Sequence, residues 1–181
     1  QADIKKYAAD NPMEVKVGEE PLKAATNKSF SISAWFCPDG EPPYGAGVDN
    51  NRCEYSIFTR PGYHTGLSYI HGGILKCVVW VRPHGSSERE PVVIQTPLRT
   101  DQWYNVGMVV DDREQIVTLY VGGKEVGKKS YEGELIEYLN KPYYIGVGNP
   151  NLSVWKNYYK GQIAEVGLWS DSLKDYEMTL I

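Results

Sequence analysis

Apolar and polar side chains alternate along most of the chain, in short segments typical of β-strands. In the segment 30–36 the apolar face carries Phe30, Ile32, Ala34 and Phe36. Ten segments follow this kind of pattern: 13–17, 30–36, 53–60, 66–70, 74–82, 92–98, 103–112, 115–123, 142–148 and 160–169. Turns rich in Gly, Pro, Asn and Asp separate them. The pattern predicts an all-β, two-sheet antiparallel sandwich with short N- and C-terminal helical turns.

The segment 160–169, KGQIAEVGLW, is apolar at both odd and even positions. A strand with two apolar faces is expected between two packed layers, so the pattern predicts a central strand that closes the sandwich. Its one carboxylate, Glu165, is predicted to be a structural acid held by a partner. The side chains of Trp35, Trp103 and Trp169 are predicted to lie in the core.

The chain has 181 residues, a formal charge of −4 and a pI near 5.4. We therefore expect one domain over 1–181, with 1–12 as an N-terminal extension, and no general attraction for nucleic acid. No apolar run approaches a membrane span, so no membrane insertion is expected, and no targeting segment is visible. The chain begins at Gln1, which predicts that it is part of a larger protein.

Three cysteines leave at least one unpaired within the chain. Cys37 ends one predicted strand and Cys53 begins the next, so a disulfide across the intervening loop is one alternative. Cys77 alternates with apolar residues and is predicted to be buried.

Fourteen tyrosines and five tryptophans suit strands, and also surfaces that bind rings while remaining hydrated. Three sets of residues are candidates for ligand binding. On the strand 74–82, Trp80 shares a face with Lys76 and Arg82, and Tyr69 and His71 lie across the hairpin. The long polar loop after residue 38 contributes Tyr44, Asp49 and Asn51. A second polar loop contributes Asn151, Trp155, Asn157 and Tyr158.

No metal or other cofactor is required by these patterns, although the two loops offer oxygen ligands that suit calcium. The candidate ligands are Asp39, Asp49 and Asn149. Cysteine and histidine lack the paired spacing of a zinc site.

Five segments in order resemble the laminin-G-like, concanavalin A-like jelly-roll domains: SFSISAWF, DQWYNVGMVVDD, QIVTLYVGGKEV, PYYIGVGN and YKGQIAEVGLWSDSLKDYEM. They span 29–181. The resemblance implies a jelly-roll β-sandwich and an extracellular or cell-surface location. Many relatives carry an acidic pair in the last strand, where this chain has Ala164 and Glu165, which weakens a calcium site carried over from the family.

The resemblance implies a non-catalytic, lectin-like domain whose partner is a glycan or glycoconjugate. One alternative is an adhesion or assembly module that binds a protein surface. Another is a glycan-cleaving enzyme, which needs two carboxylates across the scissile bond. The E-x-D-x-x-E pattern that usually supplies them on this fold is absent from the sequence.

Overall fold

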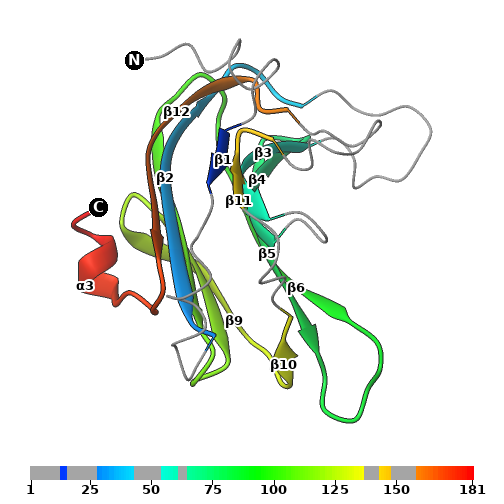
Figure 1. Ribbon diagram of the computed structural model, residues 1–181. Coiled ribbons are helices and arrows are strands. Elements are labelled where there is room, and N and C mark those ends of the chain that lie inside the picture. Colours follow the sequence, from blue (N-terminus) through cyan, green and yellow to red (C-terminus); the bar gives the residue numbers. More distant parts are fainter. Residues whose placement is uncertain (1–12, 16–27, 43–53, 61–64, 137–142, 148–157) are drawn as a thin grey trace.

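The computed structural model describes residues 13–15, 28–42, 54–60, 65–136, 143–147 and 158–181. Within these residues the strands form two antiparallel sheets that face each other as two layers (Figure 1). The prediction of an all-β sandwich, made from alternation and turn residues, is confirmed.

The first sheet, sheet A, contains seven strands in the described part of the chain. In order across the sheet they are β1 (Met13–Val15), β11 (Tyr143–Ile145), β3 (Glu54–Arg60), β4 (Thr65–Ile70), β5 (Ile74–Arg82) and β10 (Glu134–Leu135). The seventh, β6 (Glu90–Pro97), also pairs with β5.

The second sheet, sheet B, contains five strands within the described residues. Their order is β12 (Gly161–Trp169), β2 (Phe30–Pro38), β7 (Tyr104–Asp111), β8 (Ile116–Val121) and β9 (Lys124–Ser130). The alternation does not reveal β9, whose polar residues KEVGKKS face solvent for most of their length. Lysines on such an edge strand discourage pairing with another chain.

The core lies between the inner faces of the two sheets. Sheet B contributes the predicted apolar face of β2, namely Phe30, Ile32, Ala34 and Phe36. Sheet A contributes Leu67, Tyr69, Leu75, Cys77 and Val79. Burying each large apolar side chain contributes roughly 1.5–3 kcal/mol. This burial is what holds the two sheets together.

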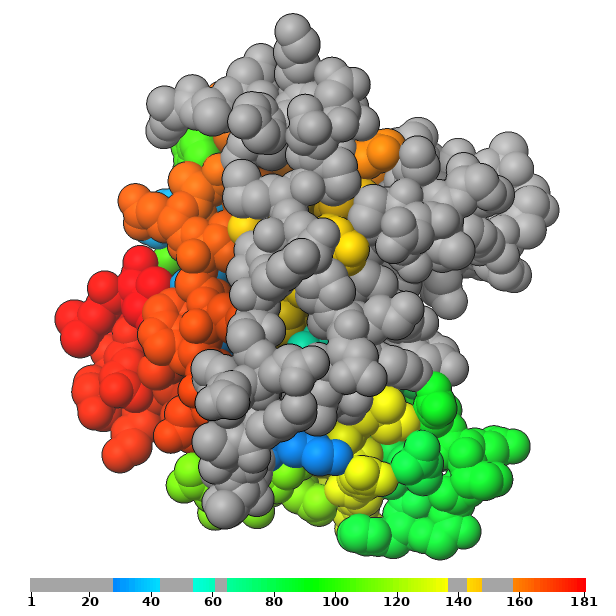
Figure 2. Space-filling model, in the orientation of Figure 1, coloured from blue at the N-terminus to red at the C-terminus, as the bar shows by residue number. Residues whose placement is uncertain are grey.

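The C-terminal segment covers part of the outer face of sheet B. It includes the short helix α3 (Asp175–Met178), close to the predicted C-terminal turn. Met178 is buried against Val109 and Tyr120, and the Tyr120 hydroxyl donates to the Asp175 carboxylate at 2.6 Å. Figures 1 and 2 show this segment beside β12, on the side of sheet B away from sheet A.

The strand β12 lies at the edge of sheet B and pairs with β2 alone among the described strands, so the prediction of a central strand is wrong. A β-bulge between Ala164 and Gly167 explains the misleading pattern. A bulge shifts the alternation by one residue. Ile163 before it and Val166 and Leu168 after it therefore all pack on one core.

Glu165 sits in this bulge with φ +49° and is exposed. It makes no hydrogen bond or ion pair with the rest of the described structure. Among the described residues the prediction that Glu165 is a structural acid held by a partner therefore finds no support.

The prediction that Trp35, Trp103 and Trp169 lie in the core is also wrong. Trp35 alternates with the buried side chains of β2 and so occupies the outer face of sheet B, where it is half-buried. Trp103 is 38% exposed. The ring of Trp169 is half-buried and lies over Gly167, the bulge having turned both residues outward.

Cys37 and Cys77 are free thiols, so the Cys37–Cys53 disulfide that the sequence left open is not formed. Cys53 and the extension 1–12 lie outside the described residues. Cys77 is buried, as predicted. In the described segments no helix has the length and hydropathy needed to span a membrane.

Gly66 provides a test of how tightly β3 and β4 pack. A Cβ on Gly66 (φ +136°) would overlap the carbonyl oxygen of Phe58, beside the bulge in β3. We expect Gly66→Ala to lower the free energy of unfolding by about 3 kcal/mol, measured by urea denaturation. The control is Gly85→Ala, which has φ +78° but open space around it. It should cost about 1 kcal/mol, from backbone strain alone. Equal losses in the two variants would contradict the close packing.

Candidate functional site

The structure places Trp80, Lys76 and Arg82 together on the outer face of sheet A, as the alternation predicts. All three are half-buried residues of β5, on the face opposite to Leu75, Cys77 and Val79. Trp80 lies opposite Pro91 of β6, and its carbonyl accepts a hydrogen bond from the backbone of Ile136.

Both cations of this set are already paired. Lys76 forms an ion pair with Glu54, whose side chain is only 3% exposed. Arg82 bonds Glu134 at 2.9 Å, and Lys28 bonds the other oxygen of Glu134 at 3.0 Å. The hydrogen bond and charge of Lys28, helped by Arg82, lower the pKa of Glu134. Lys76 and Arg82 therefore cross-link strands, which leaves little positive charge on this face for a ligand.

Tyr69 does not join Trp80. It is fully buried on the inner face of β4, its ring packs on Phe36, and its hydroxyl donates to the Leu98 carbonyl at 3.2 Å. His71 lies in the exposed β4–β5 turn, where its Nδ1 is 3.0 Å from the carbonyl oxygen of Pro42.

Most of the predicted loop residues lie outside the described part of the chain: Tyr44, Asp49, Asn51, Asn149, Asn151, Trp155 and Asn157. Tyr158 is described and half-buried, next to the buried Tyr159. Asp39 is half-buried just after β2. Within the described segments, no three His, Cys, Asp or Glu side chains gather closely enough to hold a metal ion.

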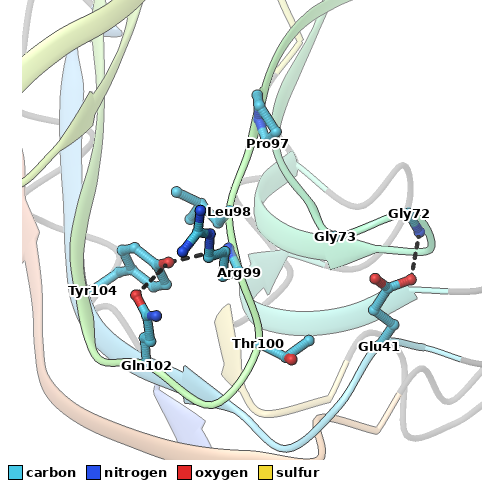
Figure 3. Close-up of a pocket in the computed structure, with 9 residues that line it drawn as sticks. All are labelled: Glu41, Gly72, Gly73, Pro97, Leu98, Arg99, Thr100, Gln102 and Tyr104. Atoms are coloured by element: carbon cyan, nitrogen blue, oxygen red, sulfur yellow. Dashed lines mark hydrogen bonds between the residues drawn. The ribbon is translucent and has the colours of Figure 1, made fainter.

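An open cleft of about 790 Å³ lies at one end of the sandwich. Three connections meet there: the residues after β2, the β4–β5 turn and the β6–β7 loop (Figure 3). It is lined by Glu41, Gly72, Gly73, Pro97, Leu98, Arg99, Thr100, Gln102 and Tyr104. Its volume falls within the range of small-molecule sites.

Gly73 sets the depth of this cleft. It adopts φ +69°, and a Cβ there would lie 2.8 Å from the Leu98 carbonyl oxygen. The missing side chain lets the Leu98 amide donate to the Gly73 carbonyl at 2.7 Å. On the same side of the cleft, Glu41 accepts a hydrogen bond from the Gly72 amide at 3.1 Å (Figure 3). These two hydrogen bonds hold the β4–β5 turn, the β6–β7 loop and Glu41 in a defined arrangement.

Tyr104 organises the β6–β7 loop. Its ring packs on Phe36, with centroids 5.9 Å apart. Its hydroxyl accepts from the Arg99 amide at 3.0 Å and donates to Gln102 Oε1 at 3.2 Å. These bonds fix the backbone at Arg99 and the side chain of Gln102 (Figure 3).

Several polar groups on the cleft walls have spare bonding capacity. The guanidinium of Arg99 and the Gln102 side-chain amide N–H groups have no partner in the described structure. Glu41 is partly exposed and can accept further hydrogen bonds. This mixture of donors and acceptors around a half-buried aromatic ring matches a ligand rich in hydroxyl groups, because each hydroxyl both donates and accepts.

None of the residues that line this cleft is among the site residues predicted from the sequence. One signal in the sequence could have located it. The segments 74–82 and 92–98 form a predicted hairpin, and antiparallel pairing places the residue before the first beside the residue after the second. Gly73 is then expected beside the end of the second segment, close to Leu98 and Arg99. Which other loop approaches them depends on the strand order, which alternation does not determine.

The sequence matches a known family over most of its length. Residues 13–178 match the Laminin_G_3 family, described as the concanavalin A-like lectin/glucanases superfamily. No curated protein matches the chain in sequence.

Solved structures with this fold include three with described binding roles. A candidate carbohydrate-binding protein from Bacteroides ovatus has a TM-score of 0.65 and 17% identity, over 94% of this chain and 44% of that one. The Ruminococcus gnavus IT-sialidase CBM40, bound to α2,3-sialyllactose, has a TM-score of 0.62 and 14% identity, over 93% and 95%. The botulinum neurotoxin DC binding domain, in complex with SialylT, has a TM-score of 0.64 and 16% identity, over 93% and 38%. At these identities the likeness concerns the fold. This chain spans less than half of the Bacteroides protein.

The Lys76–Glu54 pair can be tested by double substitution. Lys76→Met removes the ion-pair partner of a buried carboxylate, and we expect it to cost about 3 kcal/mol of unfolding free energy. Glu54→Gln together with Lys76→Met should recover much of that loss. Lys128→Met, on the exposed strand β9, serves as the control and should change stability by less than about 0.5 kcal/mol. If Lys76→Met behaved like Lys128→Met in urea denaturation, the Lys76 ammonium would be free for a ligand.

The buried phenol of Tyr69, which bonds the Leu98 carbonyl, predicts a dependence of folding stability on pH. Burial first, and the charge of Glu41 second, raise the pKa of Tyr69 from 10.0 to about 12. Below pH 10 the phenol is protonated in both states. Between about pH 10 and 12 only the unfolded chain loses this proton, so the folded state loses stability as pH rises. Tyr69→Phe should make this decline in melting temperature shallower. An unchanged decline would contradict the raised pKa.

Proposed function

The chain belongs to the concanavalin A-like lectin/glucanase superfamily, and on that premise we propose that it is a non-catalytic domain of a larger protein that binds carbohydrate. We propose the end cleft as the binding site. Its main support is the Arg99 guanidinium and the Gln102 side-chain N–H groups, which have no partner among the described residues. Tyr104 holds the Arg99 backbone and the Gln102 side chain across the cleft from Glu41.

The described roles of the structural neighbours agree with this proposal. One is a candidate carbohydrate-binding protein, and another is a carbohydrate-binding module in complex with a sialylated sugar. A cation suits a sugar that carries a carboxylate. Lys76 and Arg82 are engaged with Glu54 and Glu134, whereas Arg99 has no such partner within the described residues. Arg99 is therefore our candidate contact for an acidic glycan.

The state of two described carboxylates, Glu134 and Glu54, supports the proposal of a non-catalytic role. A general acid in glycan cleavage needs a raised pKa. The pKa of Glu134 is lowered, and Glu54 is tied to Lys76. Calcium in the loops and an extracellular or cell-surface setting remain parts of the proposal. The resemblance in fold to a neurotoxin binding domain supports the latter.

The test is a glycan array, followed by calorimetric titration of the sugars it identifies. Arg99→Ala and Gln102→Ala should each weaken binding about tenfold, since a hydrogen bond to a charged or planar polar group is worth about 1.5 kcal/mol. If Arg99 contacts a sugar carboxylate, its substitution should affect sialylated sugars more than neutral ones. Titration with and without EDTA shows whether calcium takes part.

Arg113→Ala is the matched control. Arg113 is an exposed arginine in the β7–β8 turn, at the other end of the sandwich, and its loss should leave glycan affinity unchanged. A loss of binding in Trp80→Ala but not in Arg99→Ala would move the site to the outer face of sheet A. If no glycan bound under any condition, the proposal would fail, and a protein-binding role would take its place.

A further inference from the structure

A second pocket, of about 370 Å³, lies on the outer face of sheet B. It is lined by Trp35, Trp103, Ala164, Glu165 and Ile181, and we call it the indole pocket. Trp35 of β2 lies directly opposite Ala164 of β12 in the ladder between the two strands. Trp103 immediately precedes β7, the other neighbour of β2. The pocket therefore spans three adjacent chain segments and the C-terminal residue Ile181.

The two indoles of this pocket are not used by the core. Trp103 is 38% exposed and Trp35 is half-buried, although a tryptophan gains more than most side chains from full burial. The core on the inner face is already filled, on β2, by Phe30, Ile32, Ala34 and Phe36. Both indoles line the pocket, where a ligand can reach their exposed parts.

Glu165 supplies the charge of the pocket. The bulge in β12 holds it at φ +49°, a conformation that costs a residue with a side chain about 1 kcal/mol. Backbone strain of this kind often marks a functional position. Glu165 is exposed, makes no hydrogen bond or ion pair in the described structure, and no cationic side chain lines the pocket.

We propose that the indole pocket binds an organic cation, an alkylated ammonium group being the best match. Such a group is attracted by the faces of tryptophan rings and by a carboxylate, and its methyl groups pack on apolar surface. A neutral sugar needs several hydrogen-bonding side chains, whereas the lining residues are two tryptophans, one carboxylate and the apolar Ala164 and Ile181. An anion would be repelled by Glu165.

The test uses choline as the probe and the tryptophan indole N–H signals in a ¹⁵N-labelled NMR titration as the readout. Choline should shift the signals of Trp35 and Trp103, with a dissociation constant in the millimolar range. Its neutral isostere 3,3-dimethylbutan-1-ol should not. Titrations with lysine and Nε-trimethyl-lysine then distinguish a protein side chain from a small-molecule or lipid headgroup as the source of the cation.

Substitutions separate the contributions of ring and charge. Trp103→Ala should weaken choline binding about tenfold through lost cation–π contact. Glu165→Gln should weaken it about threefold, as for an exposed ion pair. Glu114→Gln, at an exposed acid of the β7–β8 turn, is the control and should have no effect.

Three outcomes would overturn this inference. The neutral isostere could bind as tightly as choline, which would indicate a merely apolar pocket. Galactose could cause the same shifts of the indole signals as choline, or choline could cause no shifts at all. The inference does not rest on glycan binding in the end cleft. Arg99→Ala should leave choline binding intact, and Glu165→Gln should leave glycan binding intact, so either proposal can fail alone.

Discussion

The alternation of side chains along β2 is the constraint on which the rest of the structure depends. Because every second residue of β2 from Phe30 to Phe36 is apolar, its inner face must oppose sheet A, and the intervening residues must face outward. The pairing of β2 with β12 and β7 carries the same division across sheet B. One face of this sheet is thereby committed to the core. The other is left for the C-terminal segment and for the exposed indoles.

Charge is distributed unequally over the surfaces that result. On the outer face of sheet A, Lys76 and Arg82 are held by Glu54 and Glu134, so these residues join strands. At the end of the sandwich the backbone of the loops is fixed by hydrogen bonds to Tyr104 and Gly73, and the Arg99 side chain has no partner among the described residues. A rigid loop backbone with free polar side chains favours recognition, because little order has to be created on binding.

Much of the fold could be predicted from local pattern, and the errors have physical causes. Strand positions followed from alternation, since a half-buried strand shows it directly. β12 was misplaced because its bulge shifts the alternation, so that Ile163 and Val166 imitate a strand buried on both faces. Trp35 and Trp103 were assigned to the core from residue type, although the alternation of β2 already places Trp35 opposite to Phe36. The end cleft was missed because Glu41, Gly73 and Arg99 lie far apart in sequence.

The order of apolar and polar residues was sufficient to establish a two-sheet sandwich, most of its strands and the residues of its core, because burial selects side chains one position at a time. Ligand sites depend on which strand ends and loops become neighbours, and that is a property of the strand order. Only the tertiary structure brought Arg99 to Glu41 and placed Glu165 beside two indoles. Only the tertiary structure showed that Lys76 and Arg82 already form ion pairs. Their partners Glu54 and Glu134 lie on other strands, and the sequence around a lysine or an arginine does not indicate which carboxylate will pair with it.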